Sequence, residues 1–256
     1  MERIALIIPP SVFLADERVF PALGILKVAA VLEQKNYPLA VLDLNGVENY
    51  LDCLLTFLDQ EQDATHIGIT VTTSQVSAVH KIIKCIAAIN SQVKIILGGA
   101  HITAAFASLR TYEKGQGNDL GKKEVERLSK IADVLVAGDG EFAIEQALQT
   151  SSHFVDADDP DSPFFLSEMI LDNLPFPARH LIDLESYHYS IEGHKSGSLI
   201  GQLGCPYACN FCSGRLSPSF RRIRTRSAQQ VVAEMQHLYE VYHYTGFMMS
   251  DDELNI

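Results

Sequence analysis

The chain has 256 residues, of which 47% are hydrophobic and 20% charged, and its formal net charge is −12. These values are typical of a globular protein with a full buried core in one large or two modest domains. The negative charge does not favour general binding to nucleic acid. No apolar run approaches the roughly 20 residues of a membrane span. The sequence starts directly in a strand pattern, without the apolar region of a signal peptide, so we expect a cytoplasmic protein.

The first 150 residues alternate between short apolar runs and longer segments with apolar residues at helical spacing. The predicted strands are 3–8, 39–42, 66–71, 93–97 and 133–136, and the predicted helices are 21–34, 47–58, 74–89 and 141–149. Continuous apolar strands separated by helices favour a parallel sheet that is covered on both faces. The predicted fold class is therefore α/β, with a doubly wound, flavodoxin-like Rossmann domain at residues 1–150. In this architecture, ligands bind at the carboxyl ends of the strands.

Two polar segments interrupt this pattern. Residues 111–130 carry three glycines and predict a surface insertion that is partly helical near its end. Residues 153–163 contain four aspartates and two prolines, which is typical of a linker. We therefore expect an interdomain linker at residues 151–196.

A second strand–helix pattern begins at residue 197. Residues 197–203 predict a strand, and Ser227 with Gln230 forms a capping-box pattern at the start of a helix. The helix has one apolar face, and residues 246–249 predict the next strand. One strand–helix unit and one further strand cannot close a barrel. We therefore expect residues 197–256 to form only the beginning of a barrel domain, and this chain alone could be inactive.

Three of the five cysteines, Cys205, Cys209 and Cys212, lie within eight residues, directly after the predicted strand. Clustered cysteines in a reducing compartment indicate metal ligands rather than disulfides. An iron–sulfur cluster of the [4Fe–4S] type normally takes four protein ligands, so three cysteines would leave one iron open for a small molecule. A structural zinc site remains as an alternative and would need a remote fourth ligand such as His188 or His194. Cys53 and Cys85 stand alone in apolar helical patterns and predict core residues.

The Cys-x3-Cys-x2-Cys spacing, the Gly-Cys-Pro-Tyr opening and the aromatic residue before the last cysteine resemble the signature of the radical S-adenosylmethionine (radical SAM) family. The resemblance implies that the three cysteines hold a [4Fe–4S] cluster, and that its open iron binds S-adenosylmethionine (SAM) and cleaves it reductively. It also implies SAM-binding roles for Phe211, for Arg224 in an Arg-x-Arg-Thr run, and for Asp251 and Asp252 at the end of the second barrel strand. The alternatives are a solvated basic face for the arginines and a polar strand end for the aspartates.

The loops after the third, fourth and fifth strands of the N-terminal half resemble those of cobalamin-binding domains. By this resemblance the cobalamin contacts would come from Thr72, Thr73, Ser74, Gly98, Gly99, His101, Gly138 and Glu141. Many such domains carry Asp-x-His-x-x-Gly after the second strand, whereas this chain reads Asp43-Leu44-Asn45-Gly46. Cobalt would thus lack this lower histidine ligand, or cobalamin is not bound. His101 is a possible substitute, although a structural role in its loop is the alternative.

Together these resemblances imply a cobalamin-associated radical SAM enzyme. It would methylate or otherwise modify an unactivated carbon of a small-molecule substrate, with a flavodoxin or ferredoxin as electron donor. Two other hypotheses remain. One is a non-catalytic module that binds cobalamin or a nucleotide and carries a vestigial cluster loop. The other is a zinc-stabilised interaction protein.

Overall fold

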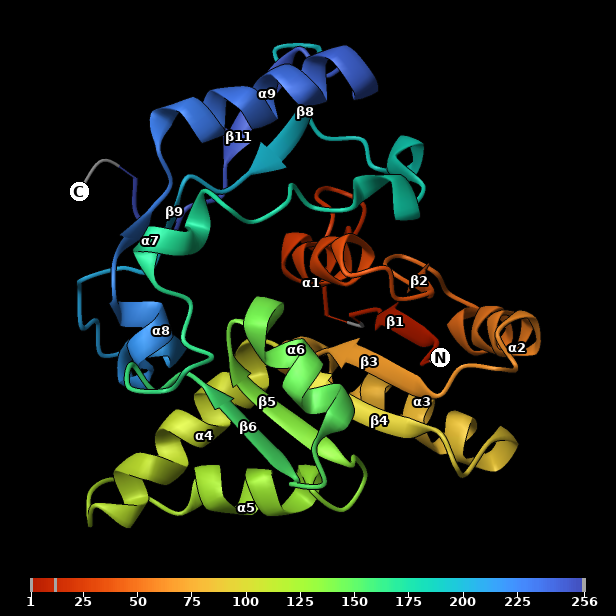
Figure 1. Cartoon of the computed structure of the whole chain (residues 1–256), viewed down its shortest axis with the longest axis vertical. Coiled ribbons are helices and arrows are strands. Elements are labelled where there is room, and N and C mark those ends of the chain that lie inside the picture. Colours follow the sequence, from red (N-terminus) through yellow and green to blue (C-terminus); the bar gives the residue numbers. More distant parts are fainter. Residues whose placement is uncertain (1, 12, 255–256) are drawn as a thin grey trace.

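The computed structural model describes residues 2–11 and 13–254, and its centre is a parallel sheet of six strands in the order β2-β1-β3-β4-β5-β6 (Figure 1). The strands are β1 (Ile4–Ile8), β2 (Leu39–Asp43), β3 (His66–Thr70), β4 (Lys94–Gly98), β5 (Val134–Gly138) and β6 (Phe154–Ala157). Every neighbouring pair in this sheet runs parallel. The predicted α/β class and the flavodoxin-like strand order are confirmed.

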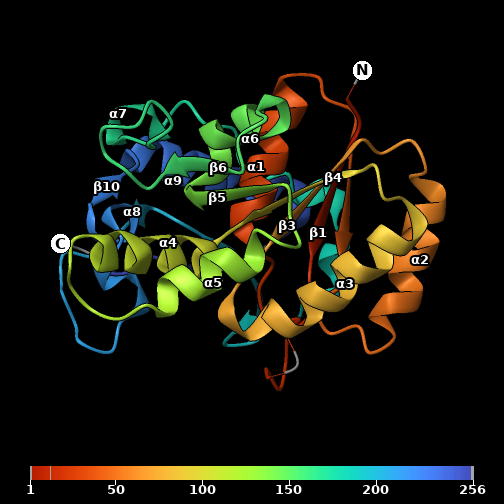
Figure 2. The ribbon, with the colours of Figure 1, turned by 90° about the horizontal axis from the view of Figure 1, so that it is seen from below.

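Helices cover both faces of the sheet, because successive side chains of each strand point to opposite faces. On one face, Ala5 and Ile7 of β1 pack with α2 (Tyr50–Gln60), α3 (Val76–Ile89), α4 (Ala100–Glu113) and α5 (Leu120–Leu128). On the other face, Leu6 and Ile8 pack with α1 (Leu23–Gln34) and α6 (Gly140–Gln149). Figure 2, seen from below, shows α2, α3, α4 and α5 in front of the sheet. No helix among the described residues is long and apolar enough to cross a membrane.

Two elements differ from the sequence-based expectations. The strand β6 pairs in parallel with β5, so the sheet continues into the segment that we assigned to the linker, and the boundary at residue 150 is too early. The aspartates of this segment made it look like a polar linker. In the structure, Asp156 in β6 and Asp158 directly after it form ion pairs with Arg110. The helix α4 was not predicted, and it begins directly after Gly99. The polar insertion at 111–130 therefore contains the end of α4 and the whole of α5.

The C-terminal part forms a strand–helix–strand unit that lies beyond α1 in Figure 1. The strand β8 (His194–Leu199) runs parallel to β11 (Gly246–Met249), and α9 (Ala228–Tyr242) connects them. The side chain of Ser227 accepts a hydrogen bond from the backbone N–H of Gln230, which confirms the predicted cap. Around this unit lie β7 (Ser190–Ile191), β9 (Gln202–Leu203), β10 (Arg224–Thr225), α7 (Glu168–Leu171) and α8 (Pro218–Arg221). The strand predicted at 197–203 is thus divided between β8 and β9.

The connecting segment is bound to both parts of the molecule. The backbone N–H of Ala178 donates to the carbonyl of Leu26 in α1, at 3.0 Å. The next residue, Arg179, is 2% exposed, and its guanidinium donates to Glu234 of α9 at 2.7 Å and to the carbonyl of Ser198 at 2.8 Å. Since a buried charge is costly without a partner, this pair fixes α9 to the segment that packs on α1.

Gly138 ends β5 with a φ of +88°, and a Cβ atom there would overlap the backbone of Ala157 in β6. We predict that Gly138→Ala lowers the free energy of unfolding by about 2–4 kcal/mol, through backbone strain and steric overlap. Chemical denaturation measures this value. Gly115→Ala is the matched control, because Gly115 has a φ of +76° with no atom within 4 Å of the added methyl group. Equal losses for the two variants would show that the contact with β6 is unimportant.

Candidate functional site: a cavity between the two parts of the chain

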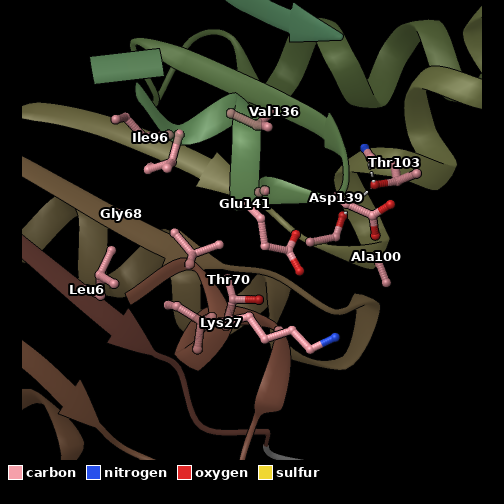
Figure 3. Close-up of a pocket in the computed structure, with 18 of the residues that line it drawn as sticks. Leu6, Lys27, Gly68, Thr70, Ile96, Ala100, Thr103, Val136, Asp139 and Glu141 are labelled. Carbon is pink, nitrogen blue, oxygen red and sulfur yellow. Dashed lines mark hydrogen bonds between the residues drawn. The ribbon is translucent and has the colours of Figure 1, made fainter. Parts of the chain in front are cut away.

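A cavity of about 220 Å³ lies at the carboxyl ends of β3, β4 and β5, where a doubly wound sheet binds its ligands (Figure 3). Thr70, Gly98 and Gly138 bring the ends of these strands to its wall. The helices α1 and α6 form another wall. Residues of the C-terminal part complete the lining, namely Ile200, Leu203 and Phe220. The cavity is therefore built jointly by the Rossmann domain and by the segments that flank the cysteine loop.

Glycines keep this cavity open. A Cβ atom at Gly24 in α1 would meet nothing within 4 Å, so this part of the helix faces empty space. Gly99 has a φ of +104°, and a Cβ atom there would lie 2.9 Å from the backbone of Val71. The turn from β4 into α4 consequently requires glycine. The walls are mostly apolar, as in sites for organic ligands and cofactors.

Two opposite charges face the cavity from α1 and α6. The side chains of Lys27 and Glu141 both project into the open space in Figure 3. Glu141 is 5% exposed, and burial raises the pKa of its carboxyl group. The nearby charge of Lys27 acts in the opposite direction, and that of Asp139 raises the pKa further. A titratable group with a perturbed pKa beside an apolar cavity is typical of a functional site.

The predicted cobalamin contacts fall into two groups. Gly98, Gly99, Gly138 and Glu141 line the cavity. Thr72, Thr73, Ser74 and His101 are not among its lining residues. Instead, Thr72 caps the turn through Gln75, and the Thr73 hydroxyl lies 3.1 Å from Nδ1 of His101.

The other ring nitrogen of His101, Nε2, lies 2.8 Å from Glu124 of α5. Both ring nitrogens are therefore engaged, which agrees with a structural role for this histidine. Lining residues outside the eight predicted contacts are Gly24, Lys27, Thr70, Ala100, Thr103, Asp139 and Gly140, together with apolar wall residues.

The loop after β2, which carries Asn45 in place of the expected histidine motif, has its own hydrogen-bond network. The amide of Asn45 donates to the hydroxyl of Tyr187 at 3.1 Å, and this hydroxyl donates to Asp43 at 2.7 Å. Arg18 also binds the same carboxylate, at 2.6 Å. Burial and the Asp43 charge raise the pKa of Tyr187, so the phenol stays protonated. None of Asp43, Asn45 and Tyr187 lines the cavity.

Backbone contacts join the start of the cysteine loop to the segment that follows it, while the middle of the loop is exposed to solvent. Gly204, with a φ of +82°, packs against the carbonyl of Arg222, and the backbone N–H of Cys205 donates to the carbonyl of Phe220 at 3.0 Å. Cys205 is half-buried, and Cys209 and Cys212 are exposed. Within the described part of the chain, no three His, Cys, Asp or Glu side chains are arranged as a metal site. The donor set nevertheless fits an iron–sulfur cluster, because it offers three free thiols within one short loop.

The two histidines considered as zinc ligands have hydrogen-bond partners away from the cysteine loop. Nε2 of His188 lies 2.8 Å from Asp16, and Nδ1 of His194 lies 3.2 Å from the hydroxyl of Thr245.

Asp158, directly after β6, joins the cysteine-loop region to the Rossmann domain. Its carboxylate is fully buried and accepts hydrogen bonds from the hydroxyls of Ser217 and Ser219 at 2.5 and 2.6 Å. Arg110 of α4 forms an ion pair with the same carboxylate. A second ion pair connects Asp139 to Arg224, which is 2% exposed. These contacts hold Phe220 against the cavity.

The four residues predicted to bind SAM differ in their exposure and in their hydrogen bonds. Phe211 is 93% exposed. The backbone N–H of Gly201 donates to one oxygen of Asp251 at 2.7 Å, while its other oxygen is buried without a hydrogen-bond partner among the described residues. Asp252 accepts from the N–H of Gly204 at 3.2 Å. The guanidinium of Arg224 is directed to Asp139 and to the carbonyls of Leu166 and Ser219, so its SAM-binding role stays a prediction without support from the geometry.

Comparisons with known proteins agree with this architecture. Residues 13–120 match the family model of the B12 binding domain. An uncharacterised methyltransferase of Pyrococcus horikoshii is 24% identical over 99% of this chain and 54% of its own length. Cytidylyl-2-hydroxyethylphosphonate methyltransferase of Streptomyces wedmorensis is 27% identical over 91% of this chain and 51% of its own length. The chain thus spans about half the length of the curated relatives it matches.

Solved structures show the same fold. TsrM of Kitasatospora setae, a radical SAM methyltransferase solved with cobalamin and a [4Fe–4S] cluster, has a TM-score of 0.66 at 18% identity, over 99% of this chain and 49% of its own. OxsB, a cobalamin-dependent SAM radical enzyme, has a TM-score of 0.68 at 14% identity, over 99% of this chain and 34% of its own.

Residues 13–120 are thus similar to B12 binding domains, and the fold of the whole chain is similar to that of cobalamin-dependent radical SAM enzymes. The predicted resemblance to cobalamin-dependent radical SAM enzymes is therefore confirmed.

We predict that Gly24→Leu abolishes most binding of hydroxocobalamin without loss of stability. The added side chain would occupy the open space beside α1, and replacement of a helical glycine stabilises a helix by about 0.5–1 kcal/mol. Equilibrium dialysis against hydroxocobalamin, with thermal unfolding as the second measurement, tests both parts. Gly24→Ala is the control and should retain binding, because a methyl group meets no atom there. Undiminished binding by the leucine variant would place the ligand outside this cavity.

Proposed function

We propose that this chain is the cofactor-binding half of a cobalamin-dependent radical SAM enzyme that methylates a small-molecule substrate. The observation that carries the proposal is the shared cavity, which is built at once by the carboxyl edge of the B12-type sheet and by residues on both sides of the cysteine loop. This cavity would take one part of the cofactor. In the enzyme, the cluster would supply an electron for SAM cleavage, and cobalamin would carry the methyl group.

The residues of this chain would bind and position these groups. Cys205, Cys209 and Cys212 would ligate the cluster. One oxygen of Asp251 is a buried acceptor without a hydrogen-bond partner among the described residues, which suits the amino group of SAM, and Asp252 accepts from Gly204 nearby. The glycines at the ends of β4 and β5 would let the backbone approach the corrinoid closely. Phe220 and Leu203 would exclude water from the side of the cavity next to the cysteine loop.

Two expectations about partners and location belong to the same proposal. The cluster would need an electron donor such as a flavodoxin or ferredoxin, and the enzyme would work in the cytoplasm. The phosphonate relative supports a small-molecule substrate, since its name specifies a nucleotide-linked phosphonate.

Reconstitution with iron and sulfide under anaerobic conditions tests the cluster. We predict about four irons per chain and a [4Fe–4S]⁺ signal in electron paramagnetic resonance that shifts when SAM is added. Cys209→Ala should abolish the signal, whereas Cys53→Ala, in α2, should leave it intact. Stoichiometric zinc without visible absorption would instead support the zinc-stabilised interaction protein. Cobalamin binding with a signal that ignores SAM would support the non-catalytic module.

The proposal also includes the expectation that cobalt would receive no histidine ligand from this chain. Cobinamide carries no nucleotide base, so a splitting by an axial nitrogen in the resonance spectrum of its Co(II) form would come from the protein. We predict no such splitting, because Asn45 is bound to Tyr187 and both ring nitrogens of His101 are engaged. A nitrogen splitting that disappears in His101→Ala would contradict this prediction and identify His101 as the ligand.

A further inference from the structure

Lys27 and Glu141 are a pair of opposite charges that face one cavity without touching each other. Within the described residues, Lys27 forms no ion pair with any carboxylate, although it is half-buried. The carboxyl group of Glu141 is almost fully buried and bonds to its own backbone N–H at the start of α6, and no other side chain of the described residues donates to it. An ammonium group and a carboxyl group that line the same apolar cavity without pairing indicate a ligand that can contact both.

The same two helices carry a second, contrasting pair. Lys35, just after α1, forms an ion pair with Glu145 of α6 at the surface. The helices approach closely, since a Cβ atom at Gly140 would lie 2.8 Å from the side chain of Val28. Lysine and glutamate on α1 and α6 can thus reach each other directly at the surface. At the cavity they remain apart.

We propose that Lys27 and Glu141 together bind a carboxamide group of the ligand, with the ammonium group donating to the amide oxygen and the carboxyl group accepting from the amide N–H. A carboxylate or phosphate on the ligand would face Glu141 and Asp139, and a cationic group would face Lys27. A neutral amide alone satisfies both members, and the apolar walls favour a neutral group over a charged one. This inference rests on the proposed corrinoid binding, because a corrin ring carries acetamide and propionamide side chains.

Equilibrium dialysis of the 256-residue chain against hydroxocobalamin and against cobinamide tests the pair. Lys27→Met and Glu141→Leu should each weaken the binding of both ligands by about 10-fold, the loss of one charge-assisted hydrogen bond. Glu141→Gln should stay within about 3-fold of the wild-type affinity, because its amide oxygen still accepts from N–H. The doubly substituted control, Lys35→Met with Glu145→Gln, removes the surface pair of the same helices and should bind as the wild type does.

The monocarboxylic acids derived from hydroxocobalamin, each with one amide replaced by a carboxylate, provide a test that does not depend on destabilising the protein. The wild type should bind one of these isomers about 10-fold more weakly than hydroxocobalamin, and Glu141→Gln should largely restore its binding.

Three results would overturn the inference, and they are distinguishable. If the wild type and Glu141→Gln each bind every isomer as tightly as they bind hydroxocobalamin, amide recognition by this pair is excluded. Weaker binding of hydroxocobalamin but not of cobinamide by Lys27→Met and Glu141→Leu would assign the pair to the nucleotide tail. If the wild type retains neither corrinoid, the proposed function itself fails together with the inference.

Discussion

The buried carboxylate of Asp158 is the contact on which the arrangement of the site depends most directly. It follows β6 at the edge of the sheet and binds Arg110 of α4, and it also binds the two serines that follow the cysteine loop. A fully buried charge is stable only while these partners remain in place, so each partner holds the others. Loss of the contact would free the chain that carries Phe220, and the cavity would lose its wall next to the cysteines. The ion pair between Asp139 and Arg224 reinforces this connection from the neighbouring strand.

This connection explains why the site is shared between two parts of the molecule. The sheet supplies glycine-rich turns at the ends of β4 and β5, as a doubly wound fold does for many ligands. The segments around the cysteine loop supply apolar side chains that close the same space. A cofactor in the cavity would therefore lie next to whatever the three cysteines hold. Such proximity is what a reaction that uses two cofactors requires.

Much of the fold could be predicted from sequence, because a buried parallel strand leaves an unbroken apolar run. The strand β6 could not, since Asp156 lies within it and its partner Arg110 is far away in sequence. The helix α4 was missed because Gly98 and Gly99 indicated a loop, and glycine here serves the turn that starts the helix. The three cysteines were evident from their spacing alone. The position of Lys27 at the cavity was not predicted, because a helical pattern shows which residues share a face but not which of them lie beside the strand ends.

Arg224 shows a different limit of sequence reasoning. An arginine near three cysteines suggested contact with an anionic ligand, but the structure directs it to Asp139, a residue 85 positions away. The partner of this arginine depends on the tertiary fold, which the local sequence does not reveal.

The most direct test of the account is the magnetic interaction between the two cofactors in one sample. The chain would be loaded with cobinamide in its Co(II) form and with the reduced [4Fe–4S]⁺ cluster, and its resonance spectrum would be recorded with each group alone and with both. A cavity beside the cysteine loop predicts that the two spins interact, with faster relaxation and broadened lines when both are present. A spectrum equal to the sum of the two separate spectra would contradict the shared site.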